Sequence, residues 1–239
     1  MGRAYEVRKA SIQKTGAAKG KVYSNYAKEI YQAAKNGGTD IDSNASLKRL
    51  IDRAKKEQVP QDIIRRAIDK VNSGIDESYV SNVYELFGPG ASTLIIECLT
   101  DNVNRSISDL RAVINKCHIK MGAIGSVSYM YEHLCVVGFK ELNEEEVLDI
   151  LISNDIDIVD IETNENTVII YGNPQDLFKI KESINNTKQV DFDIDEIAYI
   201  AKDKIELVGE ELEIFNKLLT MLDDVEDVSS VSHNVSNIG

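Results

Sequence analysis

The sequence predicts an α+β protein of three domains, in which one domain is inserted into another. Apolar residues at helical spacing over residues 21–71 indicate a bundle of three short helices. Residues 134–200 follow the order strand, helix, strand, strand, helix, strand, which is the ferredoxin-like plan. Strand and helix signals at 93–131, joined by a helix and a strand after residue 205, predict a plait-like α/β domain. The predicted domains are a basic flexible arm and helical bundle at 1–75, a middle α/β domain at 76–132 plus 205–239, and the inserted ferredoxin-like domain at 133–204.

The predicted bundle follows a basic N-terminal segment. The first helix, in "KVYSNYAKEIYQAAKNGG", is expected to end at Asn36 and the two glycines after it. Asp42 or Ser43 is expected to cap the second helix, and Pro60 suits the first turn of the third. The segment ahead of them, "GRAYEVRKASIQKTGAAKGK", holds one acidic residue and is typical of a flexible basic arm.

Strands and turns dominate the predicted middle domain. Gly88, Pro89 and Gly90 form a tight reversal between the strands "SNVYELF" and "STLIIECL". A helix is expected over 103–117, and alternation of apolar and small residues predicts a further strand over 126–131. In the inserted domain, the turn at 164–166 is expected to close the central hairpin.

The charge is divided unevenly along the chain, whose net charge is -13. Of the 27 Lys and Arg, 16 lie in residues 1–70 and 11 in the rest; of the 40 Asp and Glu, 8 lie in residues 1–70 and 32 in the rest. The N-terminal part is therefore a basic head on an acidic body, and the acidic body repels phosphate. We expect a nucleic acid to be bound by the head alone. The residues expected to contact phosphates are Arg3, Arg8, Lys9, Lys14, Lys19 and Lys21 of the arm and Lys28, Lys48, Arg49, Arg53, Lys55, Lys56, Arg65 and Arg66 of the bundle.

A second cluster of polar residues lies where the strand "STLIIECL" meets the helix after it. Its members are Thr100, Asp101, Asn102, Asn104 and Arg105. One of the first three is expected to cap the helix, and the remaining residues make the junction a possible binding site; capping alone is the alternative.

Cysteines and hydropathy limit the classes of function. The three cysteines, Cys98, Cys117 and Cys135, lie in apolar patterns and form no CxxC pair, so they predict core thiols in a reducing cytoplasm and no metal site. No apolar run is long enough to span a bilayer. The three histidines are scattered, and no nucleophile, base and orienting group come together. We therefore expect no enzyme activity, no cofactor and no small-molecule substrate.

Several segments together resemble one known family over nearly the whole chain. They include "KVYSNYAKEIYQAAK", "VPQDIIRRAIDK", "YELFGPGASTLIIECLTDNVNR", "GSVSYMY" and "DDVEDVSSVSHNV". The sequence is similar to the YebC/PmpR family of bacterial regulators, in its YeeN-type branch, and to the related mitochondrial translational activators. The family usually has a tryptophan near its start, where this chain has Ala4 and Tyr5. The resemblance implies three domains and a non-enzymatic role in gene expression.

Two functions remain open at this stage. The first is a cytoplasmic, DNA-binding regulator of transcription. The second is a ribosome-associated translation factor that binds ribosomal or transfer RNA with the same basic head. Composition does not choose between them; we expect the first, with the second as the alternative.

Overall fold

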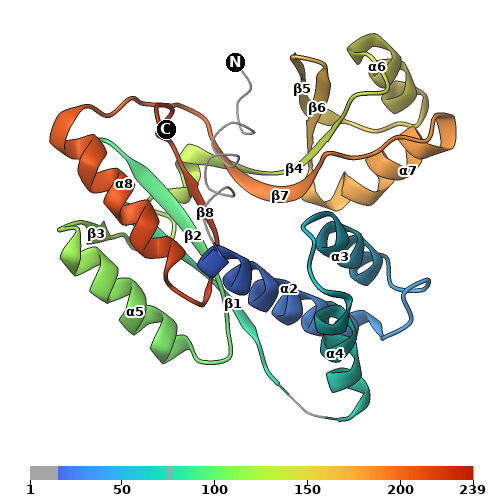
Figure 1. Cartoon of the computed structure of the whole chain (residues 1–239). Coiled ribbons are helices and arrows are strands. Elements are labelled where there is room, and N and C mark those ends of the chain that lie inside the picture. The colour runs from blue at the N-terminus through green and yellow to red at the C-terminus, as the bar shows by residue number, and fades with distance from the viewer. Residues whose placement is uncertain (1–15, 75–76, 239) are drawn as a thin grey trace.

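The structure is a computed structural model, and it describes residues 16–74 and 77–238. It consists of a helical bundle and two four-stranded antiparallel sheets, each sheet with its own helices (Figure 1). The predicted α+β fold with three units is confirmed. No helix in the described ranges combines the length and the apolar character needed to cross a membrane.

The bundle consists of α2 (Gly16–Gly37), α3 (Ala45–Lys56) and α4 (Gln61–Asn72). Its core includes Ile30, Leu47 and Ile51, all nearly fully buried. Helix α2 begins at Gly16, so the expectation of a flexible arm is wrong for residues 16–21, which are helical. The rest of the predicted arm lies outside the described residues.

The cap of α3 is Asn44, one residue after the two candidates predicted from the sequence. Its side chain accepts a hydrogen bond from the Leu47 amide at 3.0 Å and donates to the carbonyls of Ala33 and Gly38. One amide side chain therefore caps α3 and also satisfies carbonyls at the end of α2. A Cβ atom at Gly37 would lie 2.6 Å from Asn44 Nδ2, so this close approach requires glycine.

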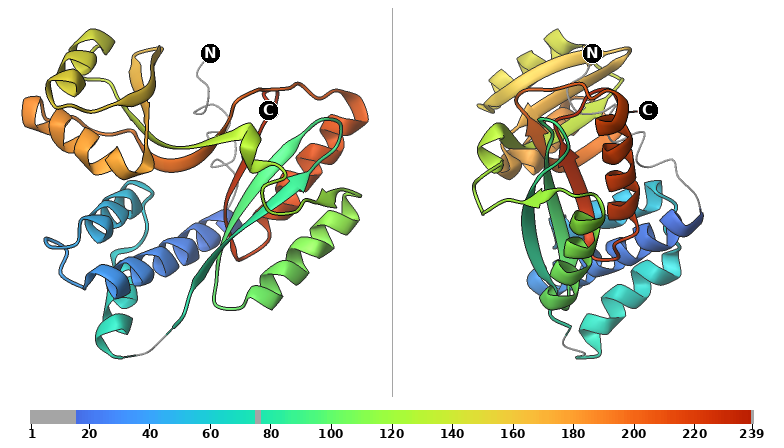
Figure 2. Two further views of the ribbon diagram at one scale, coloured as in Figure 1. Left: turned by 180° about the vertical axis from the view of Figure 1, so that it is seen from behind. Right: turned by 90° about the vertical axis from the view of Figure 1, so that its left-hand side faces the viewer.

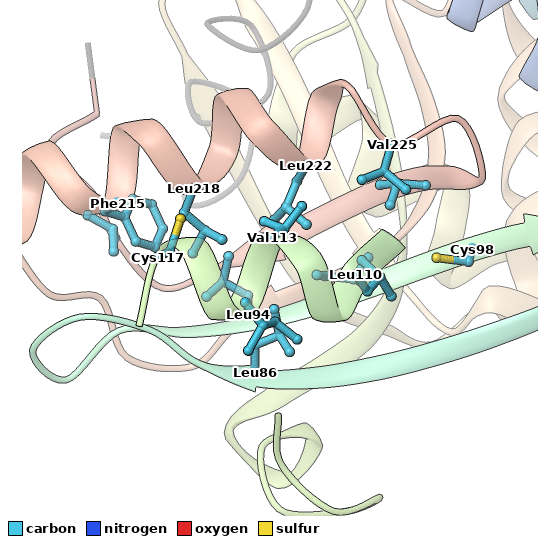
Figure 3. Close-up of a cluster of buried hydrophobic side chains, with 14 of the residues drawn as sticks. Leu86, Leu94, Cys98, Leu110, Val113, Cys117, Phe215, Leu218, Leu222 and Val225 are labelled. Carbon is cyan, nitrogen blue, oxygen red and sulfur yellow. The ribbon is translucent and has the colours of Figure 1, made fainter. Parts of the chain in front are cut away.

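The middle domain contains the sheet with strand order β3-β1-β2-β8. Its elements are β1 (Val80–Phe87), β2 (Thr93–Thr100), α5 (Val103–Lys116), β3 (Lys120–Met121), α8 (Gly209–Asp223) and β8 (Val228–His233). Figure 3 shows α5 and α8 packed on one face of this sheet, where Leu94, Leu110 and Phe215 are fully buried. The C-terminal helix and strand thus complete a core begun more than a hundred residues earlier.

The strand expected over 126–131 is not formed, and this prediction is wrong. A 3-10 turn (Ser128–Met130) occupies the segment, and Tyr131 begins the next strand. The carboxylate of Glu85 on β1 accepts hydrogen bonds from the amides of Gly125, Val127 and Ser128, the first and last at 2.7 and 3.0 Å. Amides held by this carboxylate cannot join a strand ladder.

The inserted domain contains the second sheet, with strand order β5-β6-β4-β7 and antiparallel pairing throughout. Its elements are β4 (Tyr131–Phe139), α6 (Glu144–Ser153), β5 (Ile158–Asn164), β6 (Thr167–Gly172), α7 (Leu177–Thr187) and β7 (Ile194–Ala201). This order is the predicted ferredoxin-like topology. The hairpin turn holds Glu165 at a φ of 54°. The paired strands β4 and β7 join this domain to the middle domain (Figure 2).

Each of the three cysteines is buried and unpaired. Cys98 and Cys117 belong to the core of the middle domain, and Cys135 belongs to that of the inserted domain. Burial raises the pKa of Cys98 to about 12, so this thiol stays protonated at neutral pH. The prediction of core thiols is confirmed.

Candidate nucleic-acid interface

Exposed cations of the head lie on all three described helices of the bundle. They include Lys19 on α2, Lys48 and Lys55 on α3, and Arg65 and Arg66 on α4. Arg66 pairs with Asp62 at 2.6 Å, and Lys55 lies 3.8 Å from Asp52. Exposed pairs within one helix contribute little to stability, so these cations can exchange their carboxylates for phosphates at small cost.

The basic residues of α3 form two stripes on different sides of the helix. Lys48 and Lys55 are seven residues apart and therefore share one side. The second stripe, Arg49, Arg53 and Lys56, is offset by one residue, which is roughly 100° around the helix. The first stripe is exposed to solvent, and the second faces the inserted domain.

Two residues of the second stripe of α3 contact acids in β7 and just before it, and α3 lies beside this strand in Figure 1. Arg49 donates from Nε to Asp195 at 2.8 Å. Lys56 donates to the carbonyl of Phe192 at 2.7 Å and pairs with Asp191. These two cations, expected from the sequence to contact phosphates, are thus occupied within the chain in this conformation.

Arg53, between these two residues on the second stripe, lies over the ring of Tyr26, 6.0 Å from its centroid. Burial opposes the charge of Arg53, but Tyr26, Glu29 and Asp195 outweigh this and raise its pKa above the ordinary value. Asp195, the partner of Arg49, therefore also stabilises the charge of Arg53.

Two predicted phosphate ligands on α2 dock the bundle on the middle domain instead of facing solvent. Lys21 donates to the carbonyls of Leu222 and Asp223 at 3.2 and 2.9 Å, and burial lowers its pKa. Lys28 is only 7% exposed and pairs with Asp227 at 3.0 Å. The sequence predicts a phosphate contact for Lys28, but in this conformation the side chain is buried against Asp227, a partner that the sequence does not reveal.

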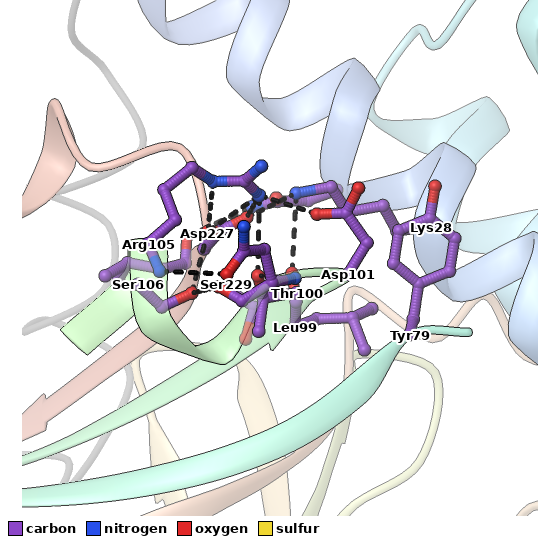
Figure 4. A network of polar contacts seen from close by, with 12 residues as sticks. Lys28, Tyr79, Leu99, Thr100, Asp101, Arg105, Ser106, Asp227 and Ser229 are labelled. Atoms are coloured by element: carbon purple, nitrogen blue, oxygen red, sulfur yellow. Dashed lines mark hydrogen bonds and ion pairs between the residues drawn. The ribbon is translucent and has the colours of Figure 1, made fainter. Parts of the chain in front are cut away.

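Asp227 is the centre of a buried polar network that joins α2, α5 and β8 (Figure 4). Its carboxylate accepts hydrogen bonds from Arg105 at 2.8 Å, from Ser106 at 2.7 Å and from Lys28. Burial alone would raise the pKa of Asp227, but these donors outweigh it and hold the pKa well below the usual range. The network satisfies a charge that burial would otherwise make costly.

The polar junction after β2 is largely accounted for by this network and by capping. Asn102 caps α5 by accepting from the Arg105 amide at 3.1 Å, which confirms that one of the first three residues is the cap. Thr100 is fully buried and accepts from the amide of Asn102 at 2.9 Å. Arg105 also pairs with Asp101 at 2.8 Å, whereas Asn104 is exposed. Binding at this junction remains a prediction.

The other predicted residues of the arm, Arg3, Arg8, Lys9 and Lys14, lie outside the described residues, as do Ala4 and Tyr5. Sequence reasoning missed the acidic partners Asp191, Asp195 and Asp227. Each lies in a segment rich in acids, and the only signal that could have found them was their charge, which is complementary to that of the head.

The fold and these contacts define a three-domain α+β protein with a basic head. Residues 3–74 match the family model described as the TACO1/YebC protein N-terminal domain, and residues 79–235 match that of the TACO1/YebC second and third domain. The chain belongs to the TACO1/YebC family, which is non-enzymatic.

Relatives cover nearly the whole chain. A probable transcriptional regulatory protein of Vibrio parahaemolyticus is 45% identical over 98% of this chain and 99% of its own length. One from Pseudoalteromonas atlantica is 43% identical over 98% and 97%. The crystal structure of the conserved hypothetical protein Aq1575 from Aquifex aeolicus is similar with a TM-score of 0.75 and 30% identity, covering 93% of this chain and 92% of that one.

Proposed function

We propose that this protein is a cytoplasmic, DNA-binding regulator of transcription whose basic head contacts phosphates. The observation that carries the proposal is a group of exposed cations on α3 and α4, including Lys48, Lys55, Arg65 and Arg66, on a head that is otherwise bordered by acidic domains. Relatives named probable transcriptional regulatory proteins support it. In the proposal, Arg3, Arg8, Lys9 and Lys14 add further phosphate contacts.

The proposed contact is with the nucleic-acid backbone. Phosphates attract lysine and arginine regardless of sequence, whereas base reading needs side chains such as Asn, Gln and Arg set at groove-facing positions. The exposed side of α3 carries Lys48, Asp52 and Lys55 instead. We therefore expect weak sequence specificity, or specificity supplied by a second partner.

The test is the binding of a short fluorescein-labelled DNA duplex of mixed sequence, followed by fluorescence anisotropy at several salt concentrations. The logarithm of affinity should fall with the logarithm of salt by about 0.9 per phosphate contacted. The double variant Lys48→Gln and Arg65→Gln should lower this slope by about 2. As a control, Arg111→Gln and Lys116→Gln remove the same charges from exposed positions of α5 and should leave the slope unchanged. A flat salt profile for the unaltered protein would contradict the proposal.

The second candidate is a ribosome-associated translation factor, and the lack of base-reading residues on the exposed side of α3 favours it. Recognition by charge and shape suits structured RNA as well as it suits DNA. Photo-crosslinking in cells from a photoreactive residue at Lys48 or Arg65, both exposed, separates the two candidates. Recovery of discrete promoter DNA supports the regulator of transcription, and recovery of ribosomal or transfer RNA replaces it with the translation factor.

A further inference from the structure

The head touches the two other domains in different ways. Its contact with the middle domain is built on a buried pair, in which the side chains of Lys28 and Asp227 are 9% and 1% exposed. Its contact with the inserted domain combines a largely buried pair, Arg49 and Asp195, whose side chains are 13% and 9% exposed, with the exposed pair of Lys56 and Asp191, whose side chains are 47% and 74% exposed. Exposed pairs are weak and are screened by salt, whereas buried ones are costly to break.

The bundle and the inserted domain share no apolar cluster among the described residues. The apolar cluster of the bundle, built around Ile30 and Leu47, contains no described residue of the inserted domain. The clusters of the inserted domain, around Phe139 and Val136, likewise contain no described residue of the bundle. The contact between α3 and the start of β7 is therefore polar, and no shared hydrophobic core opposes its separation.

Separation of the two surfaces would leave no buried charge without a partner. Asp195 is paired with Lys181 of α7 as well as with Arg49, so it keeps a cation from its own domain if α3 moves away. The guanidinium of Arg49 would then be hydrated or would bind a phosphate. Asp191 is already largely exposed, so its loss of Lys56 costs little.

We propose that the acidic edge of the inserted domain, Asp191 and Asp195, masks the second basic stripe of α3, Arg49, Arg53 and Lys56, and is displaced when a nucleic acid binds. This inference rests on the proposed function and adds regulation to it. The two carboxylates neutralise Arg49 and Lys56 as phosphates would, so the edge competes with the nucleic acid for the same cations. In the masked form the head binds without the second stripe, and displacement of the acidic edge adds the contacts of that stripe.

The first test compares two double variants of the whole chain in the duplex-binding assay. Asp191→Asn with Asp195→Asn removes the mask, whereas Glu145→Gln with Asp149→Asn removes two charges from exposed positions of α6 in the same domain. Unmasking should tighten binding about tenfold beyond the control and steepen the salt slope by about 2, because two further cations reach phosphates. The single variant Asp191→Asn, at an exposed position, should also tighten binding and steepen the salt slope. Because this single change does not disturb a buried residue, it shows the effect even if the double variant misfolds. Equal affinities and slopes in the unmasked and control variants would overturn the inference.

The second test measures the masking contact directly in the unaltered protein. A zero-length carbodiimide reagent should join the amine of Lys56 to the carboxylate of Asp191, and mass spectrometry of the digested protein quantifies the crosslinked peptide. A saturating amount of the duplex should reduce this crosslink severalfold. An unchanged crosslink in the bound protein would overturn the inference while leaving the proposed function intact.

The failures of the two proposals are distinguishable. If the unaltered protein binds the duplex with a clear salt dependence and only the unmasking effects are missing, masking alone is wrong. If neither the unaltered protein nor the unmasked variants bind duplex or structured RNA at low salt, the proposed function is wrong and the inference falls with it.

Discussion

Asp227 and Arg105, 122 residues apart in the chain, are joined side chain to side chain by hydrogen bonds from both Nε and Nη2 of the arginine, at 3.1 and 2.8 Å. The pair connects the residue before β8 to the first turn of α5. Because Lys28 of α2 contacts the same carboxylate, this pair also fixes the bundle against the middle domain. A single acid therefore links three segments that are distant in sequence.

Replacement of Asp227 by Asn should destabilise the protein by about 3 kcal/mol, because removing one charge from a buried network leaves the remaining charges uncompensated. The free energy of unfolding is measured by urea denaturation. The neighbouring exposed residue provides the control: Glu226→Gln should change stability by no more than about 0.5 kcal/mol. If both variants unfold at the same urea concentration as the unaltered protein, the network does not stabilise the fold.

The depressed pKa of Asp227 predicts a specific dependence of stability on pH. The carboxyl titrates near pH 3.9 in the unfolded chain and at lower pH in the folded protein, so its contribution is fully present above about pH 4 and is lost as the pH falls below that value. The stability difference between the unaltered protein and the Asp227→Asn variant should be constant from about pH 7 to pH 5 and narrow below about pH 4. A difference that stays the same in acid would mean that the carboxyl is not preferentially ionised in the folded state.

The local structure of the chain was predictable where short-range patterns decide it. The helices of the bundle and the ferredoxin-like order follow from the spacing of apolar residues. The cap of α3 lies just after the two predicted candidates, because Asp42, Ser43 and Asn44 all have side chains that can cap a helix. The sequence did not reveal that Asn44 also contacts Ala33 and Gly38, which selects it over its neighbours.

The predicted site was less accurate, because it depends on contacts between distant segments. The partner of Lys28 lies 199 residues away, and that of Arg49 lies 146 residues away. Charge counts correctly identified a basic head, but they cannot tell a cation that faces solvent from one that pairs with an acid of another domain. The strand expected at 126–131 fails for a similar reason, because a distant residue decides the local structure. Amides of this segment donate hydrogen bonds to Glu85, which lies on a strand about forty residues earlier.

Replacement of Glu85 by Gln should loosen the loop over 122–128. The carboxamide offers one acceptor oxygen, so at least one of the three loop amides that now bind Glu85 loses its acceptor, at a cost of about 1–3 kcal/mol. Hydrogen exchange should speed up at Gly125, Val127 or Ser128 and stay unchanged in the core of β2. Glu132→Gln, at an exposed position of β4, serves as the control and should leave loop exchange unaltered. Protection of all three amides in the Glu85→Gln variant would contradict the anchoring role.

His233 on β8 predicts a second pH dependence, in a higher range. Burial lowers its pKa to about 4, and its ring meets Phe215 edge-on with centroids 5.2 Å apart. Above about pH 6.5 the imidazole is neutral in both states; between about 6.5 and 4 the unfolded chain takes up a proton that the folded protein does not. Stability should therefore fall as the pH is lowered through this range, and this contribution stops changing below about pH 4.

The variant His233→Phe keeps an aromatic ring beside Phe215 and removes the titration. Between about pH 6.5 and pH 5 the unaltered protein should lose up to about 2 kcal/mol more stability than the variant, measured by urea denaturation at each pH. His118→Gln, at an exposed position, should behave like the unaltered protein. Parallel stability curves for the His233→Phe variant and the unaltered protein would show that His233 accepts a proton as readily in the folded protein as in the unfolded chain.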